Sequence, residues 1–151
     1  MKKIVLAVLG IAAAFYGIRW FEGHQAYNAY EGFAEGWAQE KRTAAGTYGD
    51  EPTTRHAFEE RSVRGNRAGA IMEAFRGTRY RVESQERNAA GDYELVVVQT
   101  IFFDPPGVTT AIGGAMFARF RETAGVHRTG GGWRVVAFEP TFLDMGETRK
   151  R

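Results

Sequence analysis

The first 21 residues form an almost uninterrupted apolar segment behind two lysines. Residues 4–18 read IVLAVLGIAAAFYGI without a charge, and the apolar run continues past a single Arg19. A helix needs about 20 apolar residues to cross the hydrocarbon core of a bilayer, so this run is just long enough. The pattern predicts a membrane anchor over residues 1–21. The side chains expected in the bilayer are Ile4, Val5, Leu6, Val8, Leu9, Ile11, Phe15, Tyr16, Ile18, Trp20 and Phe21.

The residues that flank this segment predict its orientation. Lys2 and Lys3 favour a cytoplasmic N-terminus, and Tyr16 and Trp20 lie where interfacial aromatics are found. A single-pass inner-membrane protein with a periplasmic C-terminal domain is therefore expected. Two alternatives remain open. Residues 12–14 (Ala-Ala-Ala) can serve as the cleavage site of a signal peptide, which would release the domain to the periplasm, and the segment can also be an apolar helix of a soluble protein.

After the anchor, apolar positions recur at spacings of three, four and seven. Glu22 and Glu31 occupy other faces, and no proline interrupts the pattern. This periodicity predicts an amphipathic helix that continues the anchor and ends near Thr43. Residues 44–53 are expected to form a loop because they contain Gly, Asp and Pro. The recurring apolar positions are Trp20, Tyr27, Tyr30, Ala34 and Trp37.

A second helical pattern runs from Thr54 to Phe75. Thr53 or Thr54 is a plausible N-cap, and Gly77 is the expected C-cap. The helix is expected to bury one apolar face against the rest of the domain. That face consists of Ala57, Phe58, Val63, Ala68, Ile71, Met72 and Phe75.

From Thr78 onward the apolar period changes to two, which predicts strands. Turn residues at 88–92 and 129–132 and the Asp-Pro-Pro-Gly segment at 104–107 divide this region into four strands. Four consecutive strands with short connections predict an antiparallel meander. The predicted strands begin at Thr78 and span Tyr93–Phe103, residues 115–127 and residues 133–142.

Helices followed by a long meander must bury the apolar face of the sheet, which predicts one α+β domain over residues 22–143. Residues 144–151 are expected to be a basic, flexible tail. The last strand opens with Gly-Gly-Trp-Arg-Val-Val at 131–136. With this feature, the order of elements over residues 25–143 resembles the cystatin-like and nuclear transport factor 2-like α+β rolls. The resemblance implies either a membrane-anchored assembly protein, as in type IV secretion systems, or an enzyme such as a polyketide cyclase or ketosteroid isomerase.

Composition and charge exclude several classes of site. The chain has no cysteine, which removes disulfides, thiolate metal sites and cysteine nucleophiles. Three of the 20 basic residues lie in the first 21 positions, so residues 22–151 carry 17 basic and 18 acidic side chains. A nearly neutral domain lacks the charge of a nucleic-acid binder, and no nucleic-acid partner or cofactor is expected.

Four polar residues on apolar faces are candidates for acid–base chemistry. Gln99, Glu122 and Glu139 each interrupt or follow the apolar positions of a strand, and Tyr80 lies on the first strand. Together they can form an acid–base pocket between helix and sheet, where burial raises the pKa of a carboxyl group toward neutrality. The simpler interpretation places both glutamates near solvent at strand ends, paired with arginines across the sheet. These arginines are Arg79, Arg81, Arg119 and Arg121.

Neither histidines nor serines form a recognisable site. His24, His56 and His127 share no metal-ligand spacing, so no metal is predicted. An interaction surface is the remaining candidate, because the helix that leaves the membrane carries several aromatic side chains. The sequence therefore favours a non-enzymatic, membrane-anchored scaffold or subunit of an envelope complex, with a protein partner or a second copy of itself. The candidate interaction residues are Tyr27, Tyr30, Phe33 and Trp37.

Overall fold

The computed structural model describes residues 2–60, 75–104 and 116–147, with side chains from residue 9 onward. Helices precede an antiparallel sheet, so the α+β prediction is confirmed. A third helical stretch, at residues 51–60, follows the second labelled helix. The labelled elements are α1 (Lys2–Ala38), α2 (Arg42–Tyr48), β1 (Phe75–Arg87), β2 (Tyr93–Phe103), β3 (Met116–Thr129) and β4 (Gly132–Glu147).

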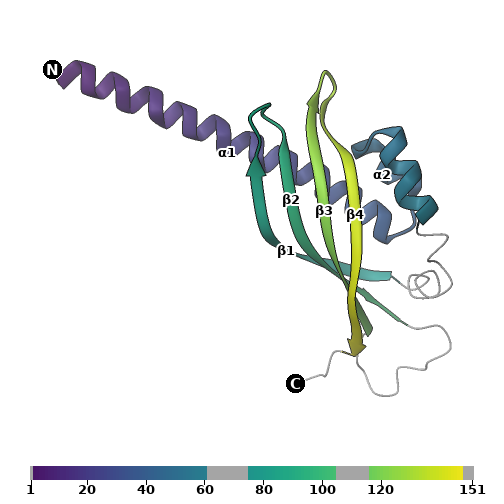
Figure 1. Ribbon diagram of the computed structural model, residues 1–151. Helices are drawn as coiled ribbons and strands as arrows, with labels where there is room; N and C mark the ends of the chain where they lie inside the picture. The colour runs from purple at the N-terminus through teal and green to yellow at the C-terminus, as the bar shows by residue number, and fades with distance from the viewer. Residues whose placement is uncertain (1, 61–74, 105–115, 148–151) are drawn as a thin grey trace.

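The four strands lie in the order β1-β2-β3-β4, and each pairs antiparallel with the next. The predicted meander is therefore confirmed, and β2 has the predicted bounds. β4 is longer than expected: it continues to Glu147 and so includes residues 144–147 of the predicted flexible tail, whose remaining residues lie outside the described ones. Figure 1 shows α1 crossing behind the sheet, with α2 beside β4.

The core lies between the second half of α1 and one face of the sheet. Tyr30, Phe33 and Trp37 are fully or almost fully buried there. Phe138 of β4 makes edge-to-face contacts with Phe33 at 5.0 Å and with Trp37 at 5.5 Å between ring centroids. Aromatic pairs in this geometry stabilise a core beyond their buried area. The aromatic face of α1 is thus the surface that holds helix and sheet together.

α1 ends at Ala38, and the prediction that it continues to Thr43 is wrong. Glu40 has a positive φ of 58°, its N–H donates to Trp37 O, and the Lys41 N–H donates to Gly36 O. This pair of hydrogen bonds around a left-handed residue is a Schellman motif, which is normally built on glycine. Because a glutamate occupies that position, no glycine marks the helix end in the sequence.

α2 and the start of the helix at residues 51–60 replace most of the loop predicted at residues 44–53. α2 packs closely on α1: a Cβ added to Gly36 would lie 2.6 Å from the backbone nitrogen of Ala45. The glycines that weaken α1 as an isolated helix therefore allow α2 to approach it. Tertiary contact, rather than local propensity, accounts for α2.

The next helix begins earlier than predicted. Asp50 is its N-cap: the Asp50 Oδ1 accepts from the Thr53 N–H at 2.8 Å, so neither predicted threonine is the cap. Phe75 belongs to β1 and not to this helix, and Gly77 lies in β1 at a register shift and is not a C-cap. Ala57 is buried and Phe58 partly buried, as expected. The other predicted buried residues, Val63, Ala68, Ile71 and Met72, lie outside the described residues.

The N-terminal part of α1 extends beyond the edge of the sheet in Figure 1. The large apolar side chains described between residues 9 and 20 are exposed, from Phe15 at 53% to Trp20 at 73%. No helix in the part of the chain with described side chains is long and apolar enough to cross a membrane. The anchor predicted over residues 1–21 has no support from that result.

Where α1 leaves the domain, it is bonded to residues near the end of β1, the start of β2 and the end of β3. Both carboxylate oxygens of Glu22 are engaged: Oε2 accepts from Arg87 at 3.0 Å, and Oε1 accepts from Arg128 at 2.8 Å. Two more bonds reach the helix backbone, from Gln85 Nε2 to Gly23 O at 2.8 Å and from the Tyr93 hydroxyl to the Arg19 carbonyl. We call these four contacts the exit latch.

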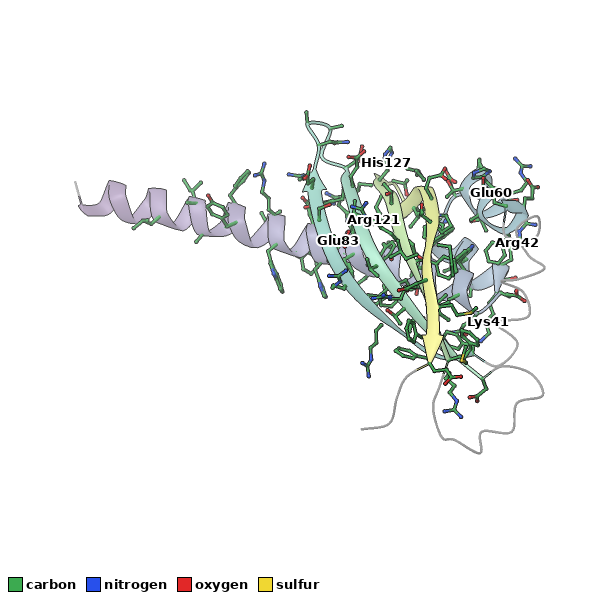
Figure 2. The ribbon with its side chains drawn as sticks, turned by 60° about the horizontal axis from the view of Figure 1, so that its bottom comes forward. Lys41, Arg42, Glu60, Glu83, Arg121 and His127 are labelled. Atoms are coloured by element: carbon green, nitrogen blue, oxygen red, sulfur yellow. The ribbon has the colours of Figure 1, made fainter. Side chains whose placement is uncertain are left out.

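The outer face of the sheet is charged. In Figure 2, Glu83 of β1 and Arg121 of β3 are neighbours on this face, and their side chains form an ion pair at 2.9 Å. Arg79 and Arg119 lie over the rings of Phe102 and Phe117. Arginine stems and cation–π contacts therefore cover the apolar side chains on this face.

Candidate functional site

A cluster of four polar side chains lies in the interface between α1 and the sheet. Tyr30 comes from α1, Tyr80 from β1, Gln99 from β2 and Glu122 from β3. Gln99, Glu122 and Tyr30 are completely buried, and Tyr80 is partly buried against the core. We call these four residues the buried polar cluster.

Strand register explains why these residues meet. β2 and β3 pair Val97 with Glu122 and Gln99 with Phe120, so Gln99 and Glu122 are diagonal neighbours on the helix-facing side. Tyr80 is paired with Gln99 across β1 and β2. α1 crosses this face and places Tyr30 against Glu122.

Hydrogen bonds connect the cluster in two pairs. The Tyr30 hydroxyl donates to Glu122 Oε2 in a short hydrogen bond. Gln99 Nε2 donates to the Ala34 carbonyl at 3.2 Å and to the Tyr80 hydroxyl at 3.3 Å. Two buried acceptors of this cluster have no hydrogen-bond partner among the described residues, namely Gln99 Oε1 and Glu122 Oε1.

Burial controls the ionisation of Glu122. Loss of solvation raises the pKa of the Glu122 carboxyl from 4.5 to about 8, although the hydrogen bond from Tyr30 acts in the opposite direction. Burial also raises the pKa of the Tyr30 and Tyr80 hydroxyls. The raised pKa values favour the protonated form of all three groups at neutral pH, and a protonated Glu122 carboxyl can donate a hydrogen bond as well as accept one.

This arrangement can donate hydrogen bonds to a negatively charged oxygen. A buried carboxyl that stays neutral at pH 7 acts as a hydrogen-bond donor in a site of low polarity. Glu122 Oε1 and Gln99 Oε1 are both buried and have no hydrogen-bond partner among the described residues. Such unsatisfied buried polar atoms in a folded protein indicate a water molecule, a ligand or a shared proton.

The structure brings together three of the four candidate acid–base residues and separates the fourth. Glu122, Gln99 and Tyr80 belong to the cluster, whereas Glu139 is exposed on β4. The expectation that Glu122 lies near solvent beside an arginine is wrong, and Arg119 pairs instead with Asp144. Tyr30 was missed as a partner because its contact with Glu122 joins residues 92 positions apart.

Glu139 belongs to a second group of ionisable side chains. His56 Nε2 lies 3.6 Å from Glu60 Oε1 and 3.8 Å from Glu139 Oε1. The three ligand-type atoms lie within 4.8 Å of one another, close enough to bind a divalent cation. His56 and Glu60 have the i,i+4 spacing of metal ligands on a helix, and the sequence interpretation missed that signal. All three side chains are accessible to water, and charge pairing explains their arrangement equally well.

An open groove of about 430 Å³ lies beside the exit latch. α1 supplies one wall and the adjoining parts of β1 and β2 supply the other. Its lining is aromatic and basic. Its lining includes Arg19, Trp20 and Tyr27 of α1, with Val82, Gln85 and Tyr93 opposite.

Three of the four candidate interaction residues lie in the core. Tyr30, Phe33 and Trp37 are no more than 3% exposed and therefore contact the sheet of the same chain. Tyr27 is partly exposed and lines the groove. No family model, no curated protein and no solved structure matches this chain.

Proposed function

We propose that the chain is a single-pass membrane protein whose α+β domain is positioned against the bilayer and serves as a non-enzymatic scaffold or subunit of an envelope complex. One observation carries the proposal: α1 is both the apolar N-terminal segment and the core helix of the domain. The proposed membrane segment and the core helix of the domain are therefore one continuous helix.

The apolar residues of this segment surround the helix. At 3.6 residues per turn, Ile11 and Ile18 lie on one side, and Leu9 and Tyr16 lie on the opposite side. All four are at least 60% exposed. A protein groove covers one stripe of a helix, whereas a helix that is apolar all round needs an apolar medium on every side. The continuation of the run to Ile4 in the sequence favours a bilayer as that medium.

Charge and latch geometry support the proposed orientation. Lys2 and Lys3 precede the apolar run, which favours a cytoplasmic N-terminus and a periplasmic domain. Glu22 is the first acidic residue of the chain, and the exit latch holds it against the sheet. A domain held in this way has a fixed orientation at the membrane surface. Its order of elements remains similar to the α+β rolls, including their membrane-anchored members.

Alkaline extraction of membranes tests the proposal. The wild-type chain should remain in the membrane pellet at high pH, with its N-terminus intact. Ile11→Arg should move the protein to the soluble fraction, because a charge at the helix centre costs about 3 kcal/mol of insertion free energy. Ile11→Leu is the matched control and should behave as wild type. A soluble wild-type protein, or a mature N-terminus at Phe15, would overturn the anchor.

The scaffold role is tested on the solubilised membrane protein. Affinity purification should recover a second protein, or a second copy of this chain, in fixed stoichiometry. Isolation only as a monomer without a partner would argue against the scaffold role.

The buried polar cluster favours a second candidate, a small-molecule-binding or isomerase-like domain. Its specific support is the neutral Glu122 carboxyl beside the Tyr30 hydroxyl, a pair able to stabilise a developing oxyanion. Glu139 has no part in this candidate because it is exposed.

A titration with a planar ketone such as 2-tetralone tests this candidate. Binding should shift the side-chain amide resonances of Gln99 in an NMR spectrum of the full chain in detergent. Glu122→Gln should weaken that binding, while Glu139→Gln should not. If 2-tetralone leaves the Gln99 resonances unchanged, the cluster is a structural network and this candidate fails.

A further inference from the structure

The groove beside the exit latch lies where the proposed membrane segment joins the domain. Arg19, Trp20 and Tyr27 line it from α1, directly after the exposed apolar residues at 9–18. Tyrosine and tryptophan prefer the headgroup region of a bilayer, where one part of the ring is apolar and the other is wet. The groove thus opens at the depth where lipid phosphates would lie.

Arg19 is the cation available in this groove. The guanidinium lies over the Phe15 ring, with Cζ 4.6 Å from the centroid, and no carboxylate pairs with it among the described residues. The nearest acidic residue in sequence, Glu22, is engaged by Arg87 and Arg128 through both oxygens. A phosphate oxygen is the kind of partner an unpaired guanidinium binds best, through two parallel N–H donors.

The walls of the groove are fixed before any ligand binds. The Gln85 side-chain amide donates a hydrogen bond to the Gly23 carbonyl, and the Tyr93 hydroxyl donates one to the Arg19 carbonyl. A Cβ at Gly23 would lie 3.1 Å from Gln85 Nε2, so glycine allows this close approach. A preformed site loses less conformational entropy on binding than a flexible one.

We propose that this groove binds the headgroup of an anionic phospholipid, with the phosphate at Arg19 and the glycerol part against Trp20, Tyr27 and Val82. The proposal rests on the membrane function above. A bound lipid would seal the junction between membrane segment and domain, and would add to the exit latch in fixing the domain's orientation.

Native mass spectrometry of the full chain released from nanodiscs tests this. The nanodiscs contain equal parts of phosphatidylglycerol and phosphatidylcholine. The wild type should retain one phosphatidylglycerol in preference to phosphatidylcholine. Arg19→Gln should reduce that retention about tenfold by removing a charge-assisted contact. Arg55→Gln, on the helix at residues 51–60, is the matched control and should retain the lipid.

A second pair of variants tests the shape of the groove without changing charge. Val82→Phe should fill the groove and lower retention to a similar extent. Leu143→Phe is its control, because Leu143 is 46% exposed and Val82 is 45% exposed. Both substitutions lie on exposed positions, so neither should unfold the domain.

The outcomes separate the two proposals. If the chain enters nanodiscs but retains both lipids equally, or if Arg19→Gln matches wild type, lipid recognition by the groove is wrong and the anchor stands. If the chain does not enter nanodiscs, both proposals fail. Tight binding of soluble glycerol 3-phosphate without any bilayer would show that the site takes a free phosphate and would also overturn the lipid assignment.

Discussion

Tyr30 of α1 donates its hydroxyl hydrogen bond to the carboxyl group of Glu122 on β3, and both side chains are completely buried. This contact joins the helix to the centre of the sheet through polar atoms, in an interface that is mostly apolar. A buried carboxyl without water must be neutral or compensated. The state of Glu122 therefore determines how the stability of the domain responds to pH.

The first prediction concerns that response. The pKa of Glu122 is raised from 4.5 to about 8 in the folded state, so between these values the folded protein holds one more proton than the unfolded chain. The stability that the protonated Glu122 carboxyl contributes to the fold is fully present below about pH 4.5. It is lost as the pH rises through about 8. The urea midpoint of the full chain in detergent should fall over that interval. The measurement is urea unfolding followed by tryptophan fluorescence at several pH values.

Glu122→Gln supplies the decisive variant for this response. Glutamine is neutral at every pH and can still accept from Tyr30, so its urea midpoint should vary much less between pH 5 and pH 8. Glu139→Gln alters an exposed carboxylate and should keep the wild-type response. A Glu122→Gln profile identical to wild type would contradict the assignment.

The second prediction concerns the Tyr30 hydroxyl. Tyr30→Phe should lower the free energy of unfolding by about 1–3 kcal/mol, because it leaves Glu122 Oε2 buried without its donor. It should also raise the pKa of Glu122 further, because the hydrogen bond from Tyr30 lowers that pKa. Tyr48→Phe is the control, since Tyr48 is 41% exposed. Equal stability of the two variants would show that the Tyr30 hydrogen bond contributes nothing.

The third prediction concerns the exit latch. Glu22→Gln should lower stability by about 1 kcal/mol, since the Glu22 side chain is only 13% exposed and bridges two arginines. Amide hydrogen exchange should become faster in the turn after Arg87, where the latch holds the hairpin. Glu94→Gln, at an exposed position on β2, should change neither quantity. Unchanged exchange in Glu22→Gln would mean that Gln85 and Tyr93 hold the helix without Glu22.

The fourth prediction concerns close helix packing. Gly36→Ala should destabilise the domain by more than about 2 kcal/mol, because the new Cβ would lie 2.6 Å and 2.9 Å from backbone atoms of Ala45. This cost exceeds the gain of about 1 kcal/mol that alanine brings to a helix. Gly17→Ala has open space around it and should not destabilise. Thermal unfolding of both variants measures the difference, and a Gly36→Ala protein as stable as wild type would contradict the packing.

The sequence by itself determined the elements whose signals are local. Alternation of apolar and polar residues predicted β2 with its observed bounds and the order of all four strands, because each strand has one buried face. The helical period of the apolar positions continues from the N-terminal segment to Trp37. This predicted one helix through the apolar and the amphipathic segments, and α1 spans that range. Such patterns depend only on residues within a few positions of one another.

Tertiary structure decided what depends on distant residues. Glu40 ends α1 in a conformation that glycine usually adopts, and α2 forms where Gly36 lets Ala45 approach. The alternation of residues on β3 is by itself compatible with either a buried or an exposed Glu122. Glu122 is buried because α1 crosses the sheet and brings Tyr30 to it from 92 positions away. Local sequence specifies which face of an element is apolar, but only the packing of elements determines which polar side chains are enclosed with it.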